Sequence, residues 1–169
     1  MSTETVIAHE SIVDALVLKM DAIAVTLPRG TAVSVVQAKK TEGLIHDALA
    51  RGAVLASGKL EREGAQLHPT ILVNVSKSMR LWSEESFGPT VGVVSFSTDC
   101  EAMDMANDRD YGLAASVFTQ NIPWAISVAK QIQSGAVHIN SMTIHDEVQL
   151  PHGGVKSSGH GRFGVPWGM

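Results

Sequence analysis

The chain has 169 residues, with 13 Lys and Arg against 17 Asp and Glu, and its formal net charge at pH 7 is −4. An acidic chain without a cluster of basic residues is not typical of proteins that bind nucleic acid or an anionic membrane surface. A hydrophobic content of 44% predicts a buried core, and no apolar run approaches the roughly 20 residues of a membrane span.

The N-terminal segment and the cysteine content indicate the cellular compartment in which the protein is expected. The segment Met1-Ser2-Thr3-Glu4-Thr5 has no basic region followed by an apolar run, so no secretory signal is expected. The single cysteine, Cys100, excludes an intrachain disulfide and a cysteine-based metal cage. We therefore expect a cytoplasmic protein that binds neither nucleic acid nor a membrane.

Helices and short strands follow one another in the first half of the chain. Apolar residues at three- and four-residue spacing predict a helix over 12–24, and Ser11 with Asp14 resembles a capping box at its start. A second helix is expected over 39–51, closed by Gly52. Its inner face consists of Leu44, Ile45, Ala48 and Leu49. Short strands are predicted at 53–56, 70–75 and 91–96.

Strands and helices alternate after residue 91. Further helices are expected to begin after Thr98 and at Asn121-Ile122-Pro123, and further strands at 114–119 and 136–140. Such alternation is typical of right-handed crossovers on a mostly parallel sheet. The predicted fold class is α/β, a mostly parallel sheet with helices on its faces.

Three ordered stretches resemble the C-terminal part of the catalytic domain of aldehyde dehydrogenases. They are Glu84-Glu85-Ser86-Phe87-Gly88-Pro89, the segment 106–119, and Gly135-Ala136-Val137-His138-Ile139-Asn140 leading into 150–159. The loop over 139–147 resembles the salicylaldehyde and vanillin dehydrogenase branch most. The resemblance implies a catalytic-domain remnant over residues 1–150, followed by a Gly-rich irregular tail over 151–169.

The chain also departs from the family pattern. In the family, a nucleophilic cysteine precedes a Met-Ser-Thr-Glu-like segment, and this chain begins with that segment, so we expect it to lack the nucleophile and the NAD-binding domain. Cys100 is not expected to replace the nucleophile, because Asp99 and Glu101 oppose formation of a thiolate. The resemblance therefore implies a truncated member that is not redox-active alone. No cofactor is expected for the isolated chain. NAD(P) is expected to bind only if the missing segments complete a full-length dehydrogenase.

Two residues match cofactor contacts of the family. Glu85 matches the glutamate that hydrogen-bonds the nicotinamide ribose, and Phe87 matches the aromatic residue beside the nicotinamide ring. Because the rest of the cofactor cleft is absent from the sequence, we expect both residues to be vestigial in the isolated chain.

A polar loop matches the lining of the family's aldehyde pocket. Its candidate substrate-pocket residues are His145, Asp146 and His152, and His145 with Glu147 forms a candidate acid–base pair, since imidazole titrates near neutral pH. His138 lies seven residues before His145, and His152 seven after it. Equal spacing in an irregular loop does not make side chains converge, so no metal site is expected.

The sequence leaves three functions open. The first is a truncated dehydrogenase scaffold that has acquired cofactor-free chemistry, such as isomerisation or cyclisation of an aromatic or polyketide-type small molecule. The second is a fragment of an NAD(P)-dependent aromatic aldehyde dehydrogenase. The third is a non-catalytic oligomerisation partner. Surfaces that pack on the remaining half in the family favour a homo-oligomer.

Overall fold

A computed structural model describes residues 3–145 and 147–164. The chain forms two compact units, an N-terminal unit that extends to Thr98 and a C-terminal unit that begins at Asp99. The predictions for Asp146, for Met1 and Ser2, and for the last five residues of the tail lie outside the described residues. The family-based division at residue 150 stays a prediction.

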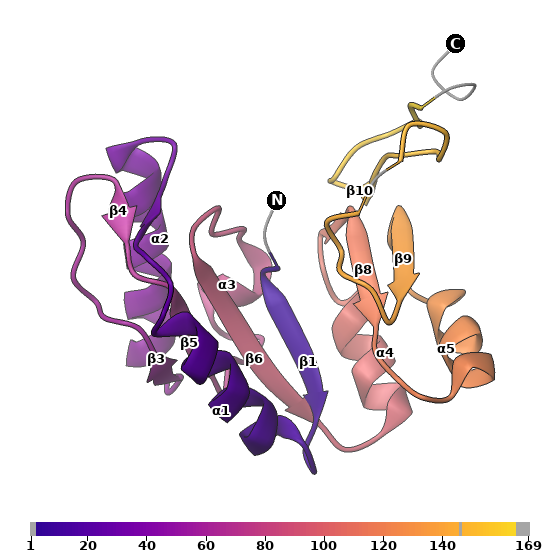
Figure 1. Ribbon diagram of the computed structural model, residues 1–169, viewed down its shortest axis with the longest axis horizontal. Helices are drawn as coiled ribbons and strands as arrows, with labels where there is room; N and C mark the ends of the chain where they lie inside the picture. The colour runs from indigo at the N-terminus through magenta and orange to yellow at the C-terminus, as the bar shows by residue number, and fades with distance from the viewer. Residues whose placement is uncertain (1–2, 146, 165–169) are drawn as a thin grey trace. The chain divides into compact units, whose positions relative to one another are not determined.

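A four-stranded sheet organises the N-terminal unit (Figure 1). Its order is β1 (Thr5–His9), β6 (Thr90–Phe96), β5 (Thr70–Val73) and β3 (Val54–Ser57). The central strand β6 runs parallel to both β1 and β5, whereas β3 is antiparallel to β5. A separate antiparallel pair joins β2 (Gly30–Thr31) to β4 (Gln66–Leu67). The α/β class is confirmed, but β1 was not predicted.

Three helices accompany this sheet: α1 (Val13–Ala24), α2 (Val35–Ala50) and α3 (Arg80–Ser83). Helix α2 supplies much of the core, with Leu44, Ile45 and Ala48 buried as predicted. It begins four residues earlier than expected, because the Ser34 side chain accepts a hydrogen bond of 3.1 Å from the backbone N–H of Gln37.

The predicted capping box of α1 is wrong. The N-cap of this helix is Ile12, which makes no side-chain cap bond. The Ser11 hydroxyl instead lies 2.8 Å from Nδ1 of His9, at the end of β1. Ser11 is thus part of the turn between β1 and α1.

The C-terminal unit contains α4 (Asp99–Asn107), β7 (Tyr111–Gly112), β8 (Ala114–Val117), α5 (Ile122–Ala129), β9 (Ala136–Ile139) and β10 (Val155–Lys156). Strands β8 and β9 are parallel and α5 connects them, as the alternation predicts. The expectation of one sheet from residue 91 onward is wrong, because β6 pairs with β1 and β5 instead. Helix α5 is capped by Asn121, whose side chain accepts from the backbone N–H of Trp124 at 3.1 Å.

Part of the Gly-rich tail is ordered by pairing with the unit. Strand β10 is antiparallel to β7. At the start of β9, the backbone of Gly153 approaches so closely that a Cβ on Gly135 would lie 1.7 Å from the Gly153 carbonyl oxygen. A glycine is therefore required at position 135. Within the described part of the chain, no helix is both long and apolar enough to cross a membrane.

Candidate functional site

The loop 84–89, between α3 and β6, holds an aromatic side chain away from the core. Phe87 adopts a φ of 47° and is 64% exposed. A left-handed backbone at a bulky residue costs on the order of 1–3 kcal/mol and persists only where surrounding contacts impose it. An exposed aromatic ring on a strained, anchored backbone is typical of a ligand contact.

Helix α2 anchors the middle of this loop. Ser86 is fully buried, and its carbonyl oxygen accepts hydrogen bonds of 2.7 Å from Nε2 of Gln37 and 2.7 Å from Oγ1 of Thr41. The Ser86 hydroxyl accepts from the backbone N–H of Gly88 at 3.2 Å. The carbonyl group of Ser86 is therefore satisfied by α2, a contact that no local sequence pattern predicts.

The segment that leads into β1 anchors the other side of the loop. The carboxylate oxygens of Glu4 accept hydrogen bonds of 3.2 Å each from the backbone N–H groups of Ser86 and Phe87. The carbonyl oxygen of Glu4 accepts from the N–H of Gly92 at 3.0 Å, which fixes this residue on β6. Sequence reasoning used Glu4 only as part of a family motif and did not identify this contact.

Glu85 lies half-buried beside these anchors. Its backbone carbonyl accepts a hydrogen bond of 3.1 Å from Nζ of Lys40. Burial raises the pKa of the Glu85 carboxyl, the negative charge of Glu4 raises it further, and the charge of Lys40 acts in the opposite direction. An ionised carboxylate here is short of neutralising contacts and suited to accept hydrogen bonds from the hydroxyl groups of a ligand.

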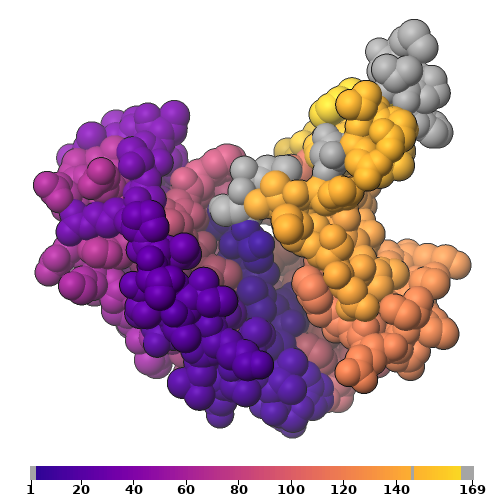
Figure 2. Space-filling view, viewed as in Figure 1, coloured from indigo at the N-terminus to yellow at the C-terminus, as the bar shows by residue number. Residues whose placement is uncertain are grey.

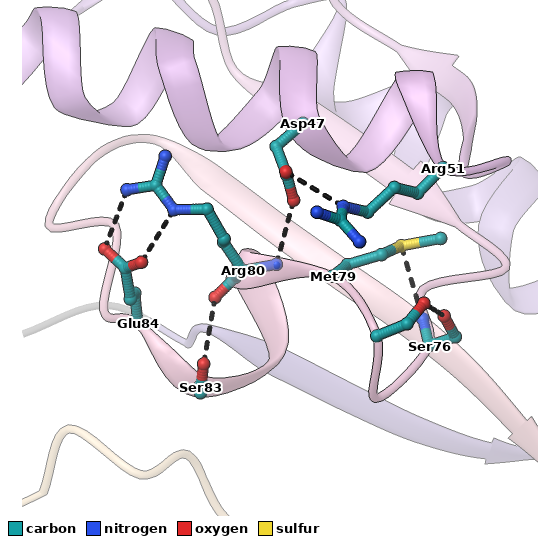
Figure 3. Close-up of polar contacts among 8 residues, drawn as sticks. Asp47, Arg51, Ser76, Met79, Arg80, Ser83 and Glu84 are labelled. Atoms are coloured by element: carbon teal, nitrogen blue, oxygen red, sulfur yellow. Dashed lines mark hydrogen bonds and ion pairs between the residues drawn. The ribbon is translucent and has the colours of Figure 1, made fainter.

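A network of charged side chains fixes α3, from which the loop begins (Figure 3). The Asp47 carboxylate accepts 2.9 Å hydrogen bonds from the backbone N–H of Arg80 and from Nε of Arg51. The Arg80 guanidinium donates to both carboxylate oxygens of Glu84, at 2.7 and 3.1 Å. The hydrogen bond from the Arg80 backbone is the main cause that lowers the pKa of Asp47, and the hydrogen bond from the Arg80 guanidinium is the main cause that lowers the pKa of Glu84.

In the C-terminal unit, the structure brings His145 and Glu147 together. Nε2 of His145 lies 3.2 Å from Oε1 of Glu147, and Nε2 of Gln149 donates to the second carboxylate oxygen. The ring of His145 also meets that of His138 edge-on, with 6.2 Å between centroids. The side chains of His145 and Glu147 are 51% and 43% exposed, so this pair is open to solvent.

His152 makes a different contact. Its backbone exchanges two hydrogen bonds of 2.8 Å with Phe163, and the two rings lie 4.9 Å apart. Asp146, the third predicted pocket residue, is outside the described residues. Within 3–145 and 147–164, no three His, Cys, Asp or Glu side chains gather in a way that would hold a metal ion. Cys100 is exposed.

Comparison with known proteins gives a consistent result over the whole chain. Residues 1–169 match the aldehyde dehydrogenase family. Vanillin dehydrogenase of Pseudomonas fluorescens is 41% identical over 174 residues, which cover 97% of this chain and 36% of that protein. Salicylaldehyde dehydrogenase of Pseudomonas putida is 38% identical, with coverage of 96% and 36%.

Solved structures agree with the sequence comparison. The crystal structure of a salicylaldehyde dehydrogenase from Pseudomonas putida G7 with salicylaldehyde matches with a TM-score of 0.93 and 34% identity, covering 97% of this chain and 36% of that one. A Mycobacterium tuberculosis aldehyde dehydrogenase with NAD+ matches with a TM-score of 0.90 and 31% identity, covering 98% and 37%. The chain thus spans about 36% of the length of the curated relatives described above.

Proposed function

The chain belongs to the aldehyde dehydrogenase family, and on this premise we propose that it carries the nicotinamide-binding and aldehyde-binding loops of an NAD(P)-dependent aromatic aldehyde dehydrogenase. The observation that carries the proposal is the anchored loop 84–89, which exposes Phe87 next to Glu85. In this proposal, the nucleophilic cysteine and the rest of the nucleotide site come from residues beyond these 169, on the same or another polypeptide.

The two loop residues fit a nicotinamide nucleotide chemically. Ribose hydroxyl groups need a hydrogen-bond acceptor, and the Glu85 carboxyl is half-buried with its negative charge only partly offset by Lys40. The flat nicotinamide ring needs an apolar face, and the exposed ring of Phe87 offers one. Glu85 and Phe87 would therefore hold the nicotinamide half, and the bound NAD(P) would accept a hydride from the substrate.

The second loop supplies the proposed aldehyde contacts. The His145–Glu147 pair, with Asp146 and His152, would line the pocket and orient an aromatic aldehyde. At 3.2 Å from Nε2 of His145, Glu147 is close enough to hold the imidazole ring in one orientation. Two relatives are dehydrogenases of vanillin and of salicylaldehyde, which supports an aromatic aldehyde as the substrate class.

The test uses the native protein purified from its source. We expect it to reduce NAD+ or NADP+ with vanillin or salicylaldehyde, and we expect Glu85→Gln and Phe87→Ala to raise the KM for the cofactor. Glu61→Gln is the matched control, since Glu61 is an exposed carboxylate of the same unit. Failure of the native protein to produce NAD(P)H from any aromatic aldehyde, or equal KM values in all three variants, would contradict the proposal.

The contact between His145 and Glu147 also favours a second candidate, the cofactor-free isomerisation or cyclisation considered above. The comparisons add no support to it. Turnover of an aromatic or polyketide-type aldehyde without nicotinamide, lost in His145→Ala and Glu147→Ala, would establish it. Equal rates in wild type and both variants would exclude this role for the pair.

Assembly and location stay proposals as well. We propose a homo-oligomer in the cytoplasm, consistent with the third possibility of an oligomerisation partner. Light scattering coupled to size-exclusion chromatography measures the assembly directly, and a strictly monomeric protein would contradict it.

A further inference from the structure

One peptide unit of the loop is held from both sides. The C=O of the Ser86–Phe87 peptide accepts hydrogen bonds from Gln37 and Thr41, at 2.7 Å each, whereas its N–H donates to Glu4 at 3.2 Å. The donors on α2 and the acceptor before β1 therefore impose the same orientation on this peptide plane.

The orientation of this peptide determines the backbone of Phe87. Rotation of the plane changes ψ of Ser86 and φ of Phe87 together, and the positive φ of 47° corresponds to the plane as it is held. A flipped plane would direct the carbonyl oxygen at the Glu4 carboxylate and the N–H at the donors of α2. The contact of the carbonyl oxygen with Glu4 would be repulsive, and the two hydrogen bonds from Gln37 and Thr41 to the Ser86 carbonyl would be lost, so the flip is opposed from each side.

The Glu4 carboxylate is suited to this task. It accepts from two successive N–H groups, those of Ser86 and Phe87, and hydrogen bonds to an ionised acceptor are stronger than neutral ones. The hydrogen bond from Gly92 to the Glu4 carbonyl keeps the residue in place. A glutamine would present one acceptor oxygen and one NH2 group, so one of the two loop N–H groups would face a donor.

We propose that Glu4 is a positioning residue that locks the Ser86–Phe87 peptide and thereby presents Phe87 and Glu85 to the nicotinamide cofactor. That Glu4 holds this peptide in one orientation follows from its hydrogen bonds to the loop. Its effect on the binding of the nicotinamide cofactor rests on the function proposed above.

The test is a comparison of Glu4→Gln with Glu10→Gln in the full 169-residue chain by NMR. Glu10 is an exposed carboxylate at the other end of β1, so Glu10→Gln is the matched control. A positive φ brings the amide proton of Phe87 close to its own Hα, which gives a strong intraresidue NOE. In Glu4→Gln we expect this NOE to weaken and exchange of the Ser86 and Phe87 amides to accelerate about tenfold.

Signals of Leu72 and Val93 report in the same spectra that the core of the unit is intact, since both residues are buried. If Glu4→Gln does not fold, Glu4→Asp keeps the charge and shortens the reach by one methylene, and the same loss of the NOE is expected. An unchanged NOE and unchanged amide exchange in the folded variant would overturn the inference, independently of the result of the cofactor titration.

Titration of the native protein purified from its source, in which the proposed function places the rest of the nucleotide site, with NAD+ and NADP+ separates the two proposals. A shift of the Phe87 amide signal on titration of the wild type, with an affinity that falls at least about fivefold in Glu4→Gln, would support both proposals. Loss of the NOE in a variant that binds the cofactor as wild type does would overturn the positioning role alone. Loss of the NOE in Glu4→Gln, with no response of the native wild-type protein to either nucleotide, would establish that Glu4 orients the peptide and would overturn the cofactor assignment, and with it the proposed function.

Discussion

The fully buried Thr41 lies so close to Gly88 that a Cβ on Gly88 would come within 2.6 Å of the Thr41 Cγ2 atom. Thr41 also donates its hydroxyl hydrogen to the Ser86 carbonyl. The middle of α2 thus fixes the loop by van der Waals contact and by a hydrogen bond at the same residue.

Gly88→Ala is therefore expected to lower the free energy of unfolding by about 1–3 kcal/mol, because the added methyl group would overlap the fully buried Thr41 side chain. Gly43→Ala, on the same helix as Thr41, is the control. A Cβ at Gly43 meets nothing within 4 Å, and the change should raise the free energy of unfolding by about 0.5–1 kcal/mol. Urea denaturation measures both, and equal effects of the two changes would contradict the close contact.

The two serines before α1 and α2 provide a second test. Ser34→Ala removes a side-chain bond to the N–H of Gln37 and is expected to lower the free energy of unfolding by about 1 kcal/mol. Ser11→Ala removes only an exposed contact with His9, so its effect should be within about 0.5 kcal/mol. Thermal unfolding compares the two, and a larger loss at Ser11 would contradict the assignment of the cap.

Both serines satisfy the local rules for a helix start, which explains the error in the sequence prediction. A capping pattern depends on a few neighbouring residues, whereas the hydroxyl of Ser11 was diverted by His9 at the end of a strand. The strand itself, β1, was missed because its partner in β6 lies about 87 residues further along. By contrast, Leu44, Ile45 and Ala48 on the inner face of α2 were predicted, since helical periodicity is contained in the segment itself, although Leu49 is only half-buried.

The same distinction applies to the candidate site. Glu85 and Phe87 were identified through a family motif, and their roles stay predictions. Glu4, Gln37 and Thr41 were missed, because no local pattern links them to a loop 45 to 83 residues away. His145 and Glu147 are only two positions apart in the sequence, so their contact could be predicted from the sequence.

The stability of the protein should depend on pH through Glu85. Its raised pKa means that the folded state binds the proton more tightly than the unfolded chain does. The resulting stabilisation is complete below the unfolded pKa and is lost as pH rises through the folded pKa. Glu85→Gln should therefore raise the melting temperature at neutral pH relative to wild type, and the difference should vanish in acid. A difference that persists unchanged in acid would contradict the ionisation argument.

Asp47 and Glu84 should have the opposite effect. Both carboxyl pKa values are lowered by Arg80, so their stabilisation is present above the unfolded pKa and is lost as pH falls through the folded pKa. Asp47→Asn and Glu84→Gln should each flatten the acid limb of the stability curve, and high salt should weaken the effect of Glu84. Melting curves at several pH values measure this, with Glu61→Gln, a change at an exposed carboxylate of the same unit, as the control.

The pairing of β1 with β6 sets a constraint on how the N-terminal unit folds. Figure 1 shows β1, in indigo, beside β6, which comes much later in the chain, and Figure 2 shows indigo atoms of the N-terminal residues on the same face of the molecule. During synthesis, Thr5–His9 emerge from the ribosome well before Gly92–Phe96, so their backbone N–H and C=O groups stay with water or a chaperone in the meantime. The hydrogen bonds of Glu4 to the loop likewise have to wait until Ser86 and Phe87 have been synthesised. The orientation of Phe87 is thus among the last native features that translation allows the unit to acquire.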